Sequence, residues 1–93
     1  MGTQETLRID KLLWHLRLAK SRTLAQSWIE AGHMRANGNR VEHAHLLIHV
    51  GDVITFPRGD DVLTIRVNQI PPRRGPAAEA QSCYSFLSAS KSG

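Results

Sequence analysis

The stretch IDKLLWHLRLAKSRTLAQSWIEAG (residues 9–32) contains two amphipathic segments separated by a short basic joint. In the first segment, apolar residues recur at the i, i+3, i+4, i+7 spacing that forms one stripe of an α-helix, namely Ile9, Leu12, Leu13 and Leu16. Asp10 falls in the first turn, where a carboxylate suits the helix dipole. We expect the stripe to be buried, and Asp10, Lys11 and Arg17 to point away from the core.

A second helix is predicted directly after the joint. Ser21 is a favourable N-cap residue, because its hydroxyl can accept a hydrogen bond from a free amide of the first turn. Apolar residues then occupy one arc of the helix, at Leu24, Ala25, Trp28 and Ile29. Gly32 fits the position after the helix, where a left-handed residue ends it. The two helices therefore meet at Lys20-Ser21-Arg22.

A small antiparallel sheet is expected after the helices. Asn37-Gly38 favours a hairpin, because both residues tolerate the positive φ of a type I′ turn. Two β-branched runs farther along flank another turn and should pair with each other. The strands are expected at residues 34–36, 39–41, 53–56 and 62–67. Residues 42–52 have a mixed period, so their structure stays open apart from a turn at Gly51-Asp52.

The two ends of the chain give weaker patterns. Residues 1–7 show no periodicity and are expected to form a flexible lead-in. Residues 71–76, PPRRGP, break regular structure, and Pro76 suits the first position of a short helix over residues 77–87. A frayed, Ser-rich end would follow. The predicted fold is α+β, with two helices packed on a small antiparallel sheet, a domain over residues 8–70 and an appendage over residues 71–93.

Composition excludes several protein classes. A chain of 93 residues has enough surface to bury for one core only. No apolar run approaches the ~18 residues that a membrane span needs, and the start lacks a secretion signal, so we expect a cytosolic protein without a membrane partner. Cys83 is the only cysteine, which excludes an internal disulfide and the usual zinc-binding thiolate clusters.

The positive charge is concentrated in one third of the chain. The net charge is +4, but residues 8–40 carry seven bases against two acids, whereas the remainder carries five bases against six acids. The seven bases are Arg8, Lys11, Arg17, Lys20, Arg22, Arg35 and Arg40. Several lie near the start of the second helix, whose free amides add partial positive charge. This combination indicates a phosphate-binding surface, which Arg35 and Arg40 would extend if the hairpin lies beside the helices.

These residues also carry a resemblance to a known family. The matching positions are Arg8-Ile9-Asp10-Lys11, Trp14, Arg17, Lys20-Ser21-Arg22, Ala25, Ile29, Gly32, Asn37-Gly38 and Val41. This pattern resembles the S4-type RNA-binding domain. Beyond it, Val50-Gly51-Asp52, LTIRV and PPRRGPAAEAQSCY are similar to the bacterial heat-shock protein 15 family, so that the likeness spans Arg8 to Tyr84.

The resemblance implies a function and a set of contacts. Members of that family are stand-alone proteins that bind ribosomal RNA and associate with stalled large ribosomal subunits that still carry a nascent chain on tRNA. It implies RNA contacts at Arg8, Lys11, Arg17, Lys20, Ser21, Arg22, Arg35 and Asn37, to which the charge pattern adds Arg40. Where relatives often carry a basic residue and Pro-Ser after the hairpin, this chain has Glu42-His43-Ala44, so we expect a weaker positive flank there.

The tryptophans and the histidines leave alternatives open. Trp14 and Leu18 could form an exposed platform for base stacking, but we favour a second buried face covered by the C-terminal segment. Trp28 should belong to the core. His43, His45 and His49 cluster within seven residues, and the first two would share one face of a strand. Because no cysteine or carboxylate is spaced to complete a zinc site, we expect no metal and no cofactor. Lone His15 and His33 are expected at the surface.

Catalysis has little support in the sequence. Ser21 has no convincing His and Asp partners, Asp60-Asp61 sits in an expected turn, and Cys83 lacks an activating neighbour. We therefore expect a monomeric RNA-binding protein rather than an enzyme. The alternatives are a metal-responsive or protein-interaction module built on the histidine segment, and a DNA-binding protein, since phosphate contacts alone do not distinguish the two sugars.

Overall fold

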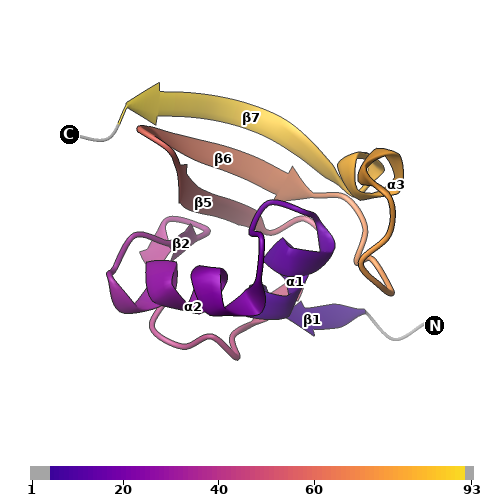
Figure 1. Ribbon diagram of the computed structural model, residues 1–93, viewed down its shortest axis with the longest axis horizontal. Coiled ribbons are helices and arrows are strands. Elements are labelled where there is room, and N and C mark those ends of the chain that lie inside the picture. Colours follow the sequence, from indigo (N-terminus) through magenta and orange to yellow (C-terminus); the bar gives the residue numbers. More distant parts are fainter. Residues whose placement is uncertain (1–4, 92–93) are drawn as a thin grey trace.

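The computed structural model describes residues 5–91 and confirms the α+β arrangement (Figure 1). Its helices are α1 (Ile9–His15), α2 (Arg22–Glu30) and α3 (Ala77–Ser82). Its strands are β1 (Thr6–Arg8), β2 (Arg35–Ala36), β3 (Asn39–Arg40), β4 (Leu47–His49), β5 (Val53–Arg58), β6 (Asp61–Val67) and β7 (Tyr84–Lys91). No helix in this part of the chain is long and apolar enough to cross a membrane.

The core lies between the helix pair and a five-stranded antiparallel sheet of order β3-β2-β5-β6-β7. Figure 1 shows α1 and α2 on one face of this sheet, with β7 at its outer edge. The predicted apolar stripe of α1 is fully buried, and it packs in one cluster with residues from the sheet such as Phe56, Ile54 and Ile65. The hydrophobic pattern of α1 therefore predicted its buried face correctly, except at Asp10 and His15, which are buried as well.

The hairpin after α2 forms as its sequence predicts. Asn37 and Gly38 have φ values of 54° and 86°, which are those of a type I′ turn. The Asn37 side chain also ties the hairpin to β5, because its Oδ1 accepts a hydrogen bond from the backbone N–H of Val53 at 2.9 Å. Its Nδ2 donates to Oδ1 of Asp52 at 3.2 Å.

The N-terminal expectation is wrong at Thr6 and Leu7, which lie in β1. This strand pairs antiparallel with β4, so the segment that the sequence left open contributes to a separate two-stranded sheet. The pairing joins residues about forty positions apart, and Ile48 of β4 is buried in the core. Neither three-residue strand has a period long enough to be recognised alone. Residues 1–4 of the expected lead-in lie outside the described residues.

The C-terminal expectation is wrong after Ser82. The helix α3 begins after Pro76, which stands at the N-cap rather than at the first helical position, and it ends six residues later. The chain then forms the eight-residue strand β7, which pairs with β6 and contains a bulge opposite Thr64/Ile65. Tyr84 and Phe86 have high β-propensity, and β6 offers unpaired backbone groups that favour strand addition over a longer helix.

Candidate nucleic-acid interface

The joint between α1 and α2 is held by backbone hydrogen bonds that project Arg17 outward. The amides of Arg17 and Leu18 donate to the carbonyls of Trp14 and Leu13, at 3.1 and 3.0 Å. This is the pattern of a Schellman motif, in which glycine usually takes the left-handed position. Here Arg17 takes it, with φ of 62°. Its exposed side chain is anchored by a hydrogen bond from Nε to the carbonyl of Gly75 at 2.6 Å.

Ser21 caps α2, as its sequence position predicts. Its Oγ accepts a hydrogen bond from the amide of Leu24 at 3.0 Å, and its backbone is extended. Lys20 and Ser21 are both exposed, so the ammonium group of Lys20 lies at the surface beside the start of α2. The remaining amides of this turn give the joint the partial positive charge expected at a helix start.

Asp10 lies inside the molecule, which corrects the expectation that it faces solvent. Its side chain has no exposed surface, and it accepts hydrogen bonds from Gln26 Nε2 at 2.8 Å and from its neighbour's amide, Lys11 N, at 2.7 Å. Arg8 donates two bonds to it, at 3.2 and 3.1 Å, and Arg22 donates one at 3.3 Å. One buried carboxylate therefore connects β1, α1 and α2.

These bonds also determine the ionisation of Asp10. Burial alone would raise the pKa of its carboxyl. The hydrogen bonds from Gln26, Lys11 and Arg8, together with the positive charge of Arg22, outweigh burial and hold the pKa below its ordinary value. Arg8 and Arg22 keep 43% and 40% of their side-chain surface exposed, so each can reach a phosphate while its other edge is fixed. The carboxylate offsets one of these two positive charges.

The C-terminal segment covers part of Trp14, which is half-buried, so the buried face that we favoured over an exposed stacking platform is only partly confirmed. Arg74 lies over the indole ring at 5.5 Å from its centroid, and its Nε donates to the backbone carbonyl of Trp14 at 3.1 Å. Leu18 is buried. The expectation for Trp28 is only partly met, because this side chain is half-buried and packs against the core from its edge.

His15 is buried, which corrects the expectation of a surface position. Its Nδ1 lies 3.3 Å from the carbonyl oxygen of Pro71. Burial lowers the pKa of His15; the contact with Pro71 raises it in part, and the positive charges of Lys11, Arg22 and Arg74 lower it further. His33, in contrast, is exposed as expected.

The depressed pKa of His15 makes stability depend on pH. The folded protein binds this proton less readily than the unfolded chain, so the free energy of unfolding should fall as pH drops below ~6.5, by at most ~1.4 kcal/mol per pH unit. Urea denaturation at a series of pH values would measure it. In His15→Gln this part of the pH dependence should disappear, and an unchanged pH profile would contradict the assignment.

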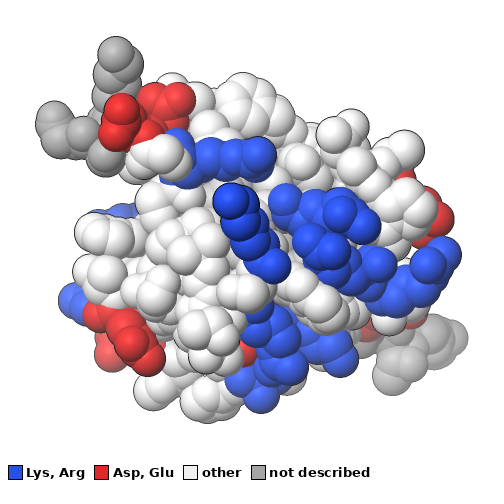
Figure 2. Space-filling view, in the orientation of Figure 1, with Lys and Arg blue, Asp and Glu red and all other residues white. Residues whose placement is uncertain are grey.

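The structure brings five of the predicted cations to one region and adds two. We call this region the joint patch and define it as Arg8, Lys11, Arg17, Lys20, Arg22, Arg58 and Arg74. Arg58 and the two joint residues Arg17 and Lys20 line one hollow. Arg74 and Lys11 both lie close enough to His15 for their positive charges to lower its pKa. Figure 2 shows Lys and Arg side chains gathered over this face of the molecule. Sequence reasoning missed Arg58, which ends strand β5, and Arg74, which lies in the irregular segment before α3.

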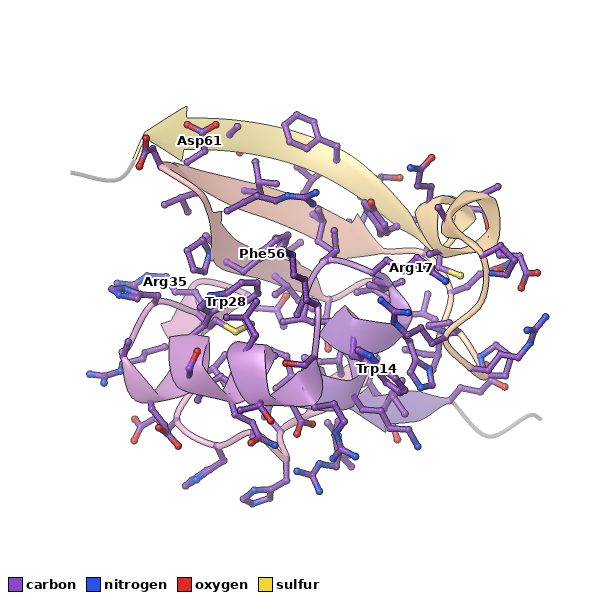
Figure 3. The ribbon with its side chains drawn as sticks, in the orientation of Figure 1. Trp14, Arg17, Trp28, Arg35, Phe56 and Asp61 are labelled. Atoms are coloured by element: carbon purple, nitrogen blue, oxygen red, sulfur yellow. The ribbon has the colours of Figure 1, made fainter. Side chains whose placement is uncertain are left out.

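Ser21 lies at the joint itself, whereas Arg35, Asn37 and Arg40 lie elsewhere. Figure 3 shows Arg35 at the opposite end of the molecule from Arg17, so the hairpin does not extend the joint patch. Arg35 and Arg40 are directly opposite each other in the β2–β3 pairing, and both are exposed. The guanidinium of Arg40 lies against Gly32, where a Cβ would come within 2.9 Å of it. The Asn37 amide is used within the fold.

In the histidine segment, whose structure the sequence left open, His43 and His45 do not lie in a strand. His43 and His45 lie in the loop before β4, with ring centroids 4.9 Å apart, and both are exposed. His49 faces Asp52 instead, with 3.6 Å between Nδ1 and Oδ2. Among residues 5–91, no group of three or more His, Cys, Asp or Glu side chains is arranged to hold a metal ion.

Comparison with known proteins identifies the family of this chain. The S4 domain family matches residues 7–54, which contain both helices, the joint and the hairpin. The chain belongs to the S4-domain family. Within it, the chain is similar to heat shock protein 15 of Escherichia coli K12, with 36% identity over 78 residues. The match covers 84% of this S4-domain chain but only 58% of the length of the E. coli protein.

For two further relatives, the match covers a larger share of the relative's own length. The RQC P-site tRNA stabilizing factor of Bacillus subtilis is 33% identical over 87 residues, which make up 94% of this chain and 99% of that protein. A solved structure of Vibrio cholerae heat shock protein 15, described as trimeric, superposes with a TM-score of 0.83 at 36% identity and covers 89% of this chain and 83% of that one. The fold prediction and the family resemblance are both confirmed.

Proposed function

We propose that this S4-domain protein binds structured ribosomal RNA through the joint patch. The observation that carries the proposal is the convergence of seven cations and the start of α2 on one face, with the buried carboxylate of Asp10 holding two of them, Arg8 and Arg22. Arg8, Arg17, Arg22 and Arg74 each hold a fixed position through a hydrogen bond. Fixed cations recognise the spacing of phosphates along a folded RNA, whereas flexible ones supply only general attraction.

The names of the relatives support a place on the ribosome. The Bacillus subtilis relative, which matches over almost its whole length, is named for stabilising tRNA in the P site. We infer that this protein acts in the cytoplasm, on large ribosomal subunits that carry a stalled nascent chain on tRNA. A monomeric state is part of the same proposal and does not follow from these names. Ser21, Arg35, Asn37 and Arg40 remain candidate RNA contacts outside the joint patch as we define it.

The proposed role is binding without catalysis. Cys83, the one cysteine, is buried, and its Sγ faces the carbonyl of Glu79 at 3.5 Å and Oε1 of Gln69 at 3.8 Å. Ser21 is engaged in capping α2. These contacts are the ordinary ones of a folded core and a helix end, and they require no substrate.

Sedimentation of a bacterial lysate through a sucrose gradient tests this proposal. We expect the protein to travel with large ribosomal subunits at low salt and to leave them at high salt, because phosphate contacts weaken as salt rises. Competition between ribosomal RNA and duplex DNA at one salt concentration tests the choice of nucleic acid. A protein that stays at the top of the gradient at low salt, or that prefers duplex DNA, would contradict the proposal.

A further inference from the structure

A groove lies beside the joint patch, between α2 and the turn that connects β5 to β6. Two hollows of about 270 and 310 Å³ form it, and they share Trp28, Pro57 and Gly59. The first hollow contains Arg17, Lys20 and Arg58, whereas the second continues past the indole to His33 and Val62. The groove is therefore basic at the end that joins the patch and apolar at the other end.

Trp28 forms the centre of this groove. Its ring is stacked on the fully buried ring of Phe56, with centroids 6.0 Å apart and an interplanar angle of 21°. Figure 3 shows the two side chains together between α2 and the sheet. Because Trp28 is only half-buried and lines both hollows, part of the indole remains open to a ligand. Phe56 fixes the position of that surface.

The charge of the groove selects the class of ligand. Among the described residues that line the two hollows, none is acidic. Asp60 follows Gly59 in the turn, and Asp61 begins β6 opposite Arg58, but neither residue lines a hollow. Three cations next to an aromatic and a proline surface fit a ligand that has a phosphate and a flat apolar part. A nucleotide has both, and its base must be unpaired to leave the helical stack.

We propose that this groove binds one unpaired nucleotide of the RNA, with its phosphate at Arg17, Lys20 and Arg58 and its base against Trp28 and Pro57. This inference rests on the proposed function and specifies it further. The protein would recognise a paired stem through the joint patch and an adjacent bulged or flipped base through the groove. The shared residues Arg17 and Lys20 make the two surfaces continuous.

Two RNA hairpins with stems from large-subunit ribosomal RNA test the groove, one carrying a bulged adenosine and one fully paired. We expect the wild-type protein to bind the bulged hairpin about tenfold more tightly, a ratio within the range of stacking on an aromatic side chain. Arg58→Gln should reduce that ratio towards one. The matched variant Arg66→Gln, which removes an exposed cation of β6 outside both hollows, should preserve it.

Fluorescence provides a second measurement that does not depend on Arg58. In Trp14→Phe, Trp28 is the remaining tryptophan of the two, so its emission should be quenched by the bulged hairpin and not by the paired one. Equal affinity for both hairpins with unquenched Trp28 would overturn the groove and leave the joint patch standing. Failure to bind either hairpin would overturn both proposals. If the groove instead binds a protein segment, the two hairpins should bind with equal affinity and leave Trp28 unquenched.

Discussion

Asp10→Asn is expected to lower the free energy of unfolding by ~2–3 kcal/mol. Removing one member of a buried ion pair costs ~3–5 kcal/mol when both partners are buried, and the partial exposure of Arg8 and Arg22 reduces this value. The amide of the new asparagine would also place an N–H donor where a carboxylate oxygen of Asp10 now accepts hydrogen bonds, so that two donors would face each other. Urea denaturation at neutral pH measures the change.

The pH dependence of the same variant gives an independent check. Because the folded-state pKa of Asp10 is lowered, its stabilisation is present above the unfolded value of ~3.9 and is lost as pH falls through the folded pKa. Asp10→Asn should lack this acid-side loss. Asp61→Asn serves as the control, because Asp61 is an exposed carboxylate at the start of β6, and it should change stability by less than ~0.5 kcal/mol. Equal effects of both substitutions would show that Asp10 is no anchor.

Lys11→Gln combined with Lys20→Gln is expected to weaken binding to large-subunit ribosomal RNA by roughly 10- to 100-fold. Each lysine would lose one contact with a phosphate, and we expect each contact to contribute ~0.7–1.4 kcal/mol, which for the two together gives this range. The structure shows no side-chain hydrogen bond or ion pair for either lysine in the described part of the protein, so folding should be preserved. Filter binding at fixed salt, together with a thermal melt, measures both properties.

A matched variant separates the position of the charges from their number. Arg35→Gln with Arg40→Gln removes the same formal charge at the opposite end of the molecule. If the joint patch is the main interface, this variant should lose less affinity than the lysine variant does. If both variants bind equally weakly, general attraction or a contact through the hairpin would explain binding, and the joint patch would lose its special role.

Local patterns in the sequence predict the helix pair, the hairpin and the β5–β6 pair. The stripe that includes Leu12 and Leu16 requires only the period of one helix, and Asn37-Gly38 requires only the φ angles of one turn. The strands β1 and β4 are too short to show a period. The strand β7 forms by pairing with the edge of β6, so it depends on the folded sheet. These elements depend on partners distant in the chain, which a local pattern does not contain.

The candidate site shows the same limit. Lys20 and Ser21 could be placed at the joint, because they follow directly from where two helices meet. Asp10 fits a helix N-terminus and gives no sign that two arginines and Gln26 surround it. Arg74 lies next to Trp14 across sixty positions of sequence. Burial of a charged side chain depends on three-dimensional neighbours, so the sequence alone led to the opposite expectation for Asp10.

The salt dependence of RNA binding tests the joint patch most directly. The logarithm of the binding constant should fall linearly with the logarithm of salt concentration, with a slope that grows by ~0.7–0.9 for each phosphate neutralised. For the wild-type protein on large-subunit ribosomal RNA, we expect a slope of magnitude ~4 or more, and a slope smaller by ~1–2 for Lys11→Gln with Lys20→Gln. A shallow slope for the wild type, or the same slope for both proteins, would contradict the account.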